Sequence, residues 1–448
     1  IDDMSMPKID EYGTQQPVAF LLFLIAHNSM YSRDPDLELR TFKDVVYYAA
    51  MAPPGGGRNS IDPRMAMQFA IFHLTTPTQD VLHAIYSAII ETHTAEDFSP
   101  GVRDVSKKVT QATLEIFHFL LSTLPPTPSK FHYLFNLRDL GRVFEGLCLT
   151  TPETVTESKD LIRLWVNEMM RVFRDRLINE EDQKVFDDKM GAVLGAEFGN
   201  EKAAADVRPI IYGDFAEAVA RISEEKEDAR LYKDLGGYVD IRKILDEVLQ
   251  LYNEDHKTMN LVLFEDALEH VTRLHRIIRN PRGNALLVGV GGSGKQSLTY
   301  LATFCAGYDL FTVNLCRGYA DTEFREDLKL LYNQLGQKPT TFLFTDAHVV
   351  QEGFLESINN MLTTGMVPAL FESDEKDAII TQIRSEVKAH GIIDTSLNCW
   401  KYFVEKCRDN LHVVLAMSPS GEVLRQRCRN FPGLVTACVV DWYYPWPK

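Results

Sequence analysis

One nine-residue segment carries the residue types that bind phosphate. It reads Gly289, Val290, Gly291, Gly292, Ser293, Gly294, Lys295, Gln296 and Ser297, and it follows the apolar run Ala285–Val288. Glycines let successive backbone N–H groups curl around a phosphate, and a helix that begins after them directs its positive end at the same point. A lysine in the position of Lys295 reaches the terminal phosphates of a nucleotide. Strand, GxxxxGK and helix together therefore predict a phosphate-binding loop (P-loop) that takes ATP or ADP.

The residue after Lys295 departs from the usual pattern. That position normally carries Ser or Thr, whose hydroxyl binds Mg²⁺, and here it is Gln296. Ser297 follows one residue later, about 100° further round the helix. We expect phosphate binding to survive this change. Mg²⁺ would be bound less tightly, by Ser297 directly or through water, or by the amide oxygen of Gln296.

A second strand-like run ends in an acidic residue. Thr341–Thr345 is rich in β-prone residues and is followed by Asp346, the Walker B arrangement in which a carboxylate holds Mg²⁺. An ATPase of this kind needs an acid at the next position to orient the attacking water, and Ala347 cannot serve. Glu352 is near in sequence but is expected on the next helix. We therefore predict a site that binds nucleotide and hydrolyses it slowly or not at all.

Most of these motifs occur a second time in the chain. Ile1-Asp2-Asp3 reads as the end of another Walker B strand, with Asp3 as the catalytic acid and Asp2 beside Mg²⁺. The other parallels are Phe42–Met51 before Ala52-Pro53 with Leu411–Met417 before Ser418-Pro419, and Asp62-Pro63-Arg64 with Arg425–Pro432. Copies about 345 residues apart indicate tandem modules, because solenoid repeats have periods of about 20–50 residues.

The composition is that of a globular protein and excludes several classes. The 448 residues include 63 Asp and Glu against 47 Lys and Arg, a net charge of −16 at pH 7. This acidity argues against nucleic-acid binding, which needs clustered cations. The longest apolar run, Val18–Ala26, is less than half of what crosses a bilayer, so we expect no membrane segment. The seven cysteines form no CxxC pair and are expected to be reduced.

The elements that must position these residues fall into three stretches. Residues 1–74 contain one expected strand, Phe42–Ala50, which a Pro/Gly-rich loop ends. Residues 75–205 have helical periodicity, clearest in Val109–Leu121 and Asp160–Leu177. Residues 206–448 contain an amphipathic helix, Phe264–Arg279, and then the alternation of strands and helices that is typical of a parallel α/β sheet. The expected strands are Ala285–Val288, Leu310–Leu315, Thr341–Thr345, Leu411–Ala416 and Leu434–Val440.

The order of P-loop, Walker B strand, sensor strand and downstream arginine resembles AAA+ ATPases, and the details resemble dynein heavy chains. The segments that carry this resemblance are Ala49–Asn59, Phe135–Leu140, Gly283–Leu298, Asn410–Pro419 and Asp441-Trp442. The resemblance implies an AAA+ P-loop NTPase fold of class α/β, with a parallel five-stranded sheet, flanking helices and an all-α small domain. Residues 1–74 would end the large domain of the third module, 75–205 would be its small (lid) domain, and 206–448 the large domain of the fourth. The Gly-Lys-Gln-Ser sequence is more similar to axonemal than to cytoplasmic dyneins.

The resemblance also implies roles for single residues. Asp2 and Asp3 would be the Walker B pair of the third module, and Arg138 would be its sensor-2 arginine. Arg427 or Arg429 would be the arginine finger that the fourth module inserts into the third module's site, and Arg64 would serve the second module's site. Four positions depart from the family pattern. Met67 replaces a second arginine, and Asp3 replaces a Glu, which makes the acid shorter. The sensor-1 positions are Ala52 and Ser418, of which only Ser418 can hydrogen-bond.

As a dynein segment, the chain would work with neighbouring AAA+ modules and with ATP or ADP and Mg²⁺. It would reach microtubules only through a stalk that is absent here, while intermediate and light chains would bind elsewhere on the heavy chain. The expected location is the cytoplasm, the cytoskeleton and the axoneme of a cilium or flagellum. Because Ile1 falls inside a Walker B motif, we expect a piece of a longer protein. Two alternatives stay open: another AAA+ nucleotide-binding scaffold, or a P-loop signalling protein with a helical adaptor.

Overall fold

The computed structural model describes residues 1–32, 36–54, 58–95, 97–199, 208–224 and 230–444. The chain forms two compact units, Ile1–Pro77 and Thr78–Lys448. The predicted boundary at 205/206 lies outside the described residues, and the three predicted domain ranges stay predictions.

The first unit is built around a small apolar core. Its elements are helix α1 (Gln16–His27), strands β1 (Ser29–Tyr31) and β2 (Leu39–Thr41), and helix α2 (Pro63–Ala66). Buried Met4, Val18 and Met65 form the core. β1 and β2 pair as an antiparallel hairpin.

The expected strand Phe42–Ala50 is wrong. These residues have an irregular backbone, although Ala50 N donates to Ile1 O (2.9 Å) and Met4 N to Ala50 O (3.2 Å). The β-prone side chains are largely exposed, Val46 at 74% and Tyr48 at 81%. β-propensity reflects packing on a half-buried sheet, and the described part of this unit supplies no such surface for these residues.

The second unit begins with a bundle of helices. They are α3 (Gln79–His93), α4 (Pro100–Thr123), α5 (Leu137–Leu147), α6 (Ser158–Met169), the π-helix η1 (Met170–Arg174) and α7 (Glu180–Glu197). The described residues between 78 and 199 contain no strand, as the helical periodicity predicts. Fully buried Trp165 on α6 donates its indole N–H to Thr113 Oγ1 on α4 at 2.9 Å, which joins the two clearest helical stretches predicted within residues 75–205.

A small hairpin and three helices connect the bundle to a central sheet. The connecting elements are β3 (Tyr212–Gly213), α9 (Ala218–Glu224), β4 (Lys233–Asp234), α10 (Tyr238–Asp255) and α11 (Glu265–Arg279). The sheet strands are β5 (Ala285–Val288), β6 (Asp309–Thr312), β7 (Thr340–Thr345), β8 (Leu411–Met417) and β9 (Val439–Trp442). The remaining helices are α12 (Lys295–Ala306), α13 (Asp321–Leu335), the 3₁₀ turn η3 (Asp346–His348), α14 (Gly353–Thr364), α15 (Ser373–Ala389), α16 (Ser396–Asn410), α17 (Val423–Asn430) and α18 (Gly433–Thr436).

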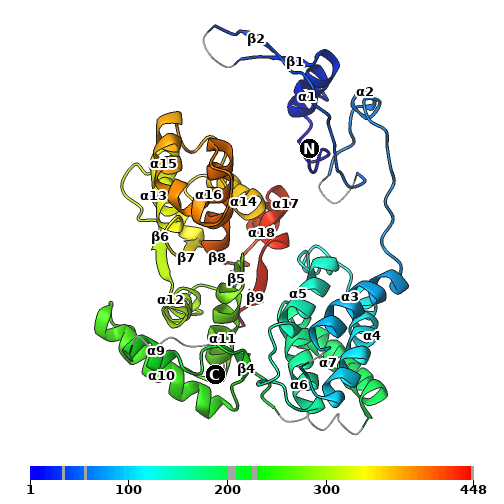
Figure 1. Cartoon of the computed structure of the whole chain (residues 1–448), viewed down its shortest axis with the longest axis vertical. Helices are drawn as coiled ribbons and strands as arrows, with labels where there is room; N and C mark the ends of the chain where they lie inside the picture. Colours follow the sequence, from blue (N-terminus) through cyan, green and yellow to red (C-terminus); the bar gives the residue numbers. More distant parts are fainter. Residues whose placement is uncertain (33–35, 55–57, 96, 200–207, 225–229, 445–448) are drawn as a thin grey trace. The chain divides into compact units, whose positions relative to one another are not determined.

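The five strands are parallel and lie in the order β6-β7-β8-β5-β9. This confirms the predicted parallel five-stranded sheet. Alternate side chains of β5 enter two different cores: Leu286 and Val288 pack with α13–α16, whereas Ala285 and Leu287 pack with α10–α12. Figure 1 shows these two groups of helices on opposite faces of the sheet. One expected strand, Leu434–Val440, is partly wrong, because Gly433–Thr436 forms the short helix α18 and β9 begins only at Val439.

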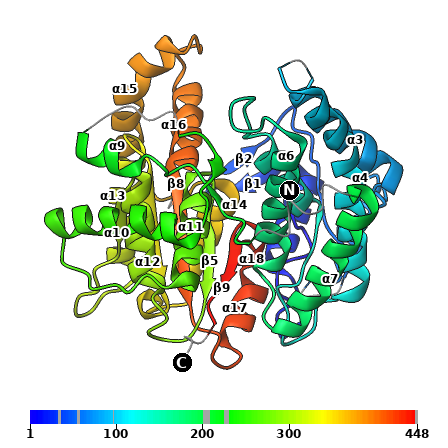
Figure 2. The same cartoon turned by 90° about the horizontal axis from the view of Figure 1, so that it is seen from below.

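The bundle and the sheet meet along β9 and α18. Arg142 on α5 donates to Thr436 O at 3.5 Å, and the His132 ring stacks on Trp442 of β9 with centroids 5.2 Å apart. Figure 2 shows α18 and β9 on the side of the sheet that faces α6 and α7. The bundle therefore borders the sheet at its β9 edge.

Candidate functional site

Three strands end at the predicted phosphate loop. β5 leads into Gly289, β7 into Asp346 and β8 into Ser418. Gly289 N donates to Met417 O at 3.1 Å, and Ser418 N donates to Asp346 Oδ2 at 2.5 Å. Because parallel strands end at one edge of a sheet, residues far apart in the sequence come together here, where open α/β sheets bind ligands.

The P-loop has the backbone that its glycines predict. Gly292 and Gly294 have φ angles of 78° and 81°, in the left-handed region, and α12 begins directly after them. The loop backbone thus turns toward the start of α12, where N–H groups are available to an anion. Gln296 is exposed and Ser297 is half-buried on the first turn of this helix.

Lys295 folds back over the loop. Its Nζ donates to Gly289 O at 2.6 Å, to Val290 O at 2.8 Å and to Ser293 Oγ at 3.0 Å. Burial lowers the pKa of Lys295, and the nearby Asp346 carboxylate opposes that shift. The ammonium thus lies against the loop backbone. A bound phosphate would take the place of these neutral oxygens and accept a stronger, charge-assisted hydrogen bond from Lys295.

Asp346 is held by an arginine of its own domain. Arg427 on α17 contacts Asp346 Oδ1 through Nη1 and Glu352 Oε1 through Nη2, each at 3.0 Å. Arg429, two residues along, is exposed. Of the two arginines expected at a neighbouring module's site, Arg427 therefore points to the carboxylate of its own site.

A cavity of about 340 Å³ adjoins the loop. Ser293 and Gly294 line one part of it, and apolar side chains line another. These apolar residues are Leu261, Val262, Phe264, Ala267 and Leu298. Its size is in the range of small-molecule sites.

Residues of the helical bundle close this cavity. Arg174, Asp175 and Gln183 line it together with Tyr443 and Tyr444. Gln183 Nε2 donates to the Tyr444 hydroxyl at 2.7 Å, and that hydroxyl donates to Leu177 O. The cavity beside the P-loop is therefore bounded by both the sheet domain and the bundle.

A buried ionic cluster forms the wall at this junction. Arg273 on α11 contacts Asp175 Oδ2 at 2.8 Å, Glu269 Oε2 at 2.7 Å and Asp441 Oδ1 at 3.4 Å. Burial raises the pKa of Asp175 to about 6, against the attraction of Arg273. For Asp441, burial also raises the pKa, but His270 and Arg273 outweigh it and the net shift is downward. The His270 ring stacks on Tyr443 with centroids 3.8 Å apart.

The other predicted residues are placed as follows. In the first unit, Asp3 contacts Arg58 Nη2 at 3.2 Å, Asp2 Oδ1 accepts the Asp3 N–H at 3.0 Å, and exposed Arg64 pairs with Asp62 at 2.7 Å. In the second unit, Arg138 is exposed at the start of α5. The roles predicted for these residues stay predictions.

The residues that line the cavity where the bundle meets the sheet domain were not predicted from the sequence. The apolar run Leu261–Phe264 directly before α11 was a usable signal, since an apolar segment ahead of a P-loop domain has to be buried somewhere. Asp175 and Arg273 carry no motif, and only the packing of the bundle on the sheet brings them together.

The described residues contain neither a membrane-crossing helix nor a preformed cluster of metal ligands. Among the helices formed by the described residues, none combines the length and apolar character that a membrane crossing requires. Within the same residues, no group of three or more His, Cys, Asp or Glu side chains is placed to hold a metal ion. Any Mg²⁺ here would need oxygens of the nucleotide as well as of the protein.

Comparison with known protein families gives three matches. Residues 259–448 match "P-loop containing dynein motor region D4", residues 1–77 match "P-loop containing dynein motor region", and residues 109–203 match "AAA+ lid domain". The matches include the P-loop, β7 and β8 in one family and most of the bundle in another.

Curated relatives match along the whole chain. It is 50% identical over 453 residues to the dynein-1-alpha heavy chain of the flagellar inner arm I1 complex of Chlamydomonas reinhardtii. It is 49% identical over 449 residues to dynein axonemal heavy chain 10 of Homo sapiens, and 41% identical over 451 residues to the dynein beta chain of the flagellar outer arm of Chlamydomonas reinhardtii. Each match covers 100% of this chain but 10% of the relative, so the chain spans about a tenth of their length.

Proposed function

Because this chain belongs to the dynein heavy chain family and is part of its AAA+ motor region, we propose that its complete P-loop site binds ADP or ATP. The observation that carries the proposal is the convergence of Lys295, Asp346 and Ser418 at the ends of β5, β7 and β8. The N–H groups of Gly291–Gly294 and the Lys295 ammonium would hold the phosphates. The apolar side chains of the adjoining cavity would hold the base.

Mg²⁺ would be bound by the nucleotide phosphates and Asp346, with Ser297 contributing directly or through water. The donor chemistry fits, since Mg²⁺ prefers one or two carboxylates together with phosphate and water oxygens. When bound, Mg²⁺ neutralises charge on the phosphates. Asp346 is paired with Arg427 in this structure, so Arg427 would compete with Mg²⁺ for this carboxylate.

We propose slow hydrolysis or none. Ala347 follows Asp346 and offers no group to orient water. Glu352 is the nearest alternative acid in sequence, but it is engaged with Arg427. The site would then serve a regulatory or structural role, in which bound nucleotide fixes the position of the loop and the cavity walls.

In the whole protein we propose that this segment lies in the ATP-driven microtubule motor ring, between neighbouring AAA+ modules. The relatives are axonemal or flagellar dyneins, which supports an axonemal location. Exposed Arg429 is the better candidate for the finger, since Arg427 is engaged. Asp2, Asp3 and Arg138 would serve the third module's site, and Arg64 the second's.

The decisive experiment is calorimetric titration of the chain with ADP and ATP in the presence of Mg²⁺. We expect Lys295→Ala to weaken binding at least about tenfold, or about 1.4 kcal/mol, because it removes the cation at the phosphates. Lys401→Ala, at an exposed position on α16, removes the same charge outside the site and should leave binding unchanged. Equal affinity in all three proteins would overturn the assignment of the site.

Phosphate release from ATP tests the second part of the proposal, slow hydrolysis or none, independently of binding. Steady turnover at about 1 s⁻¹ or faster, abolished by Lys295→Ala, would show an active ATPase and contradict slow hydrolysis. We also expect no cosedimentation of this chain with microtubules at physiological salt.

A further inference from the structure

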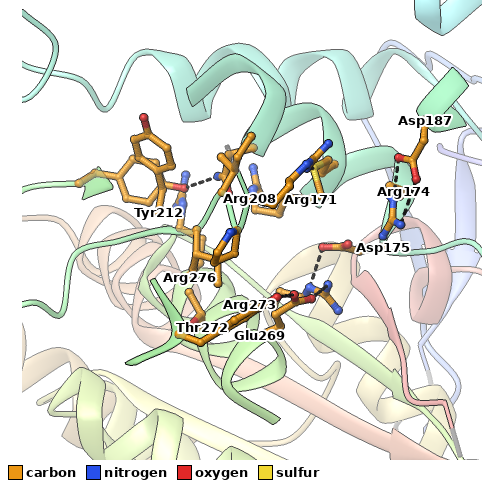
Figure 3. Close-up of a pocket in the computed structure, with 17 residues that line it drawn as sticks. Arg171, Arg174, Asp175, Asp187, Arg208, Tyr212, Glu269, Thr272, Arg273 and Arg276 are labelled. Carbon is orange, nitrogen blue, oxygen red and sulfur yellow. Dashed lines mark hydrogen bonds and ion pairs between the residues drawn. The ribbon is translucent and has the colours of Figure 1, made fainter. Parts of the chain in front are cut away.

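A second cavity lies between the helical bundle and the start of the sheet domain. Its volume is about 350 Å³, and it is bounded by η1, the β3–β4 hairpin and α11. Figure 3 shows the Arg174–Asp187 pair at one end of this cavity and Tyr212 at the other, with Arg208 and Arg276 on the Tyr212 side. The P-loop residues do not line it.

The walls carry an excess of positive charge. The lining residues include five arginines, Arg171, Arg174, Arg208, Arg273 and Arg276, and three carboxylates, Asp175, Asp187 and Glu269, a formal excess of two. Three of the arginines have carboxylate partners within 3 Å: Arg171 contacts Glu168, which lies just behind the wall, at 2.6 Å, Arg174 contacts Asp187 at 2.9 Å, and Arg273 contacts Asp175 at 2.8 Å. With Glu168 included, five arginines stand against four carboxylates, and Arg273 takes two of these, Asp175 and Glu269. Arg208 and Arg276 are therefore the two arginines of the wall without a carboxylate partner among the described residues.

Of Arg208 and Arg276, Arg276 has the more unusual surroundings, because it is buried without a charged partner in the described part of the chain. It is only 4% exposed, and its buried Nε has no hydrogen-bond partner among the described residues. Its guanidinium lies over the Tyr232 ring, 4.6 Å from the centroid, and no carboxylate of the described chain is within ion-pair distance of it. A buried guanidinium without a charged hydrogen-bond acceptor costs several kcal/mol. An anion bound in the cavity beside Arg276 would supply the missing acceptor and reduce that cost.

Arg208 is exposed and forms no ion pair with a carboxylate of the described residues. Among the described residues, its guanidinium donates from Nη1 to Met170 Sδ at 2.9 Å, and a thioether sulfur is a weak acceptor. Arg208 therefore offers an accessible guanidinium to the cavity that Arg276 lines from the buried side.

We propose that this cavity binds a phosphate dianion between Arg276 and Arg208. Arginine presents paired N–H donors that match phosphate oxygens, and two unpaired arginines match its two charges. The aromatic walls formed by Tyr212, Tyr232 and Tyr238 leave space for an organic group attached to the phosphate. The bound species is thus either inorganic phosphate or a phosphate monoester, which share this recognition chemistry.

The site borders the nucleotide cavity without belonging to it. Both cavities are lined by Arg174, Asp175, Glu269 and Arg273. An anion here would act on the Asp175–Arg273 pair, which lines both cavities. Occupancy of this cavity would therefore influence the walls of the nucleotide cavity.

The test is calorimetric titration in the Lys295→Ala background, so that the P-loop does not compete for the probe. The probes are inorganic phosphate, phenyl phosphate and ADP. We expect one phosphate or phenyl phosphate per chain. Arg276→Gln should weaken that binding about tenfold and Arg208→Gln about three- to tenfold, since each removes a charge-assisted contact. Arg242→Gln, at an exposed position on α10, removes one positive charge elsewhere and should leave it unchanged.

Tighter binding of phenyl phosphate than of phosphate would identify a monoester as the ligand class, and the reverse would identify the free ion. No phosphate binding up to about 20 mM, or equal affinity in wild-type and both arginine variants, would overturn the proposal, as would binding of ADP with neither simpler probe. If Arg276→Gln does not fold, the exposed Arg208→Gln decides the outcome alone. Nucleotide binding measured with Lys295 intact is a separate result, so failure of one proposal leaves the other standing.

Discussion

Arg427 Nη1 lies 3.0 Å from Asp346 Oδ1, which joins α17 to the end of β7. The arginine side chain is only 14% exposed, and the Asp346 side chain 40%. The carboxylate predicted to bind Mg²⁺ therefore already has a cationic partner from its own domain.

Arg427→Gln should lower the Mg²⁺ concentration needed for half-maximal ATP binding about two- to fivefold. That factor corresponds to the roughly 0.5–1 kcal/mol of a partly exposed ion pair, which no longer competes for Asp346. Fluorescent-nucleotide binding across a Mg²⁺ series measures it, with exposed Arg429→Gln as the control. A higher Mg²⁺ requirement in Arg427→Gln would mean that Arg427 contacts the nucleotide rather than competing with the metal.

Ala347→Glu should raise phosphate release from ATP about tenfold or more. The position is exposed directly after Asp346, so a glutamate has room to reach a water near the terminal phosphate, and a positioned base contributes about 10²–10⁴-fold in enzymes. Ala347→Gln has the same shape without the basic carboxylate and should remain at the wild-type rate. Equal rates in all three proteins would show that something other than Ala347 limits hydrolysis.

Gly289→Ala should destabilise the chain by about 1–3 kcal/mol through overpacking. A Cβ at Gly289 would lie 2.6 Å from Tyr443 Cβ and 3.2 Å from Tyr443 O, so backbone must move. At Gly291 the same methyl would meet no atom within 4 Å, which makes Gly291→Ala the matched control. Urea unfolding without nucleotide gives the comparison, and equal losses in both variants would refute the packing argument.

Buried histidines should make the chain acid-sensitive. Burial lowers the pKa of His412 from 6.5 to about 4, although its hydrogen bond to Gly283 O works in the other direction. Because the unfolded state binds the proton more tightly, stability is fully present above pH 6.5 and is lost as pH falls toward 4. At most about 3 kcal/mol of the unfolding free energy comes from this one group.

His412→Gln should therefore flatten the fall in unfolding free energy between pH 6.5 and 4. The comparison with wild type is needed because Asp175, whose pKa is raised to about 6, has the opposite effect: its contribution falls as pH rises from 3.8 to 6. Denaturant titrations at pH 7, 5.5 and 4.5 give the difference. Parallel pH profiles for the two proteins would show that His412 carries no such penalty.

Sequence reasoning reached furthest where local chemistry dictates structure. Gly292, Gly294 and Lys295 require a particular loop whatever surrounds them, and β5, β7 and β8 were recognisable from their apolar runs. The parallel sheet followed from the alternation of strands and helices. These are short-range patterns, and the structure has them almost at the predicted bounds.

The misses have a common physical origin in tertiary context. Phe42–Ala50 has strand-forming residues without a sheet to pair with in the described unit, and Leu434 enters α18 before β9 begins. The direction of Arg427 depends on where α17 lies relative to β7, and the partners of Asp175 on how the bundle meets α11. No spacing in the sequence encodes those distances.

The cluster around Arg273 has a consequence for how this chain unfolds. Its three carboxylates come from separate segments: Asp175 follows the bundle's π-helix, Glu269 is on α11, and Asp441 is on β9. If the bundle alone came apart, the guanidinium would lose Asp175 and the cavity wall would open to water. We therefore expect the bundle and the sheet to unfold together despite their different architectures, with helix α6 and strand β9 exchanging their amide protons through the same cooperative opening.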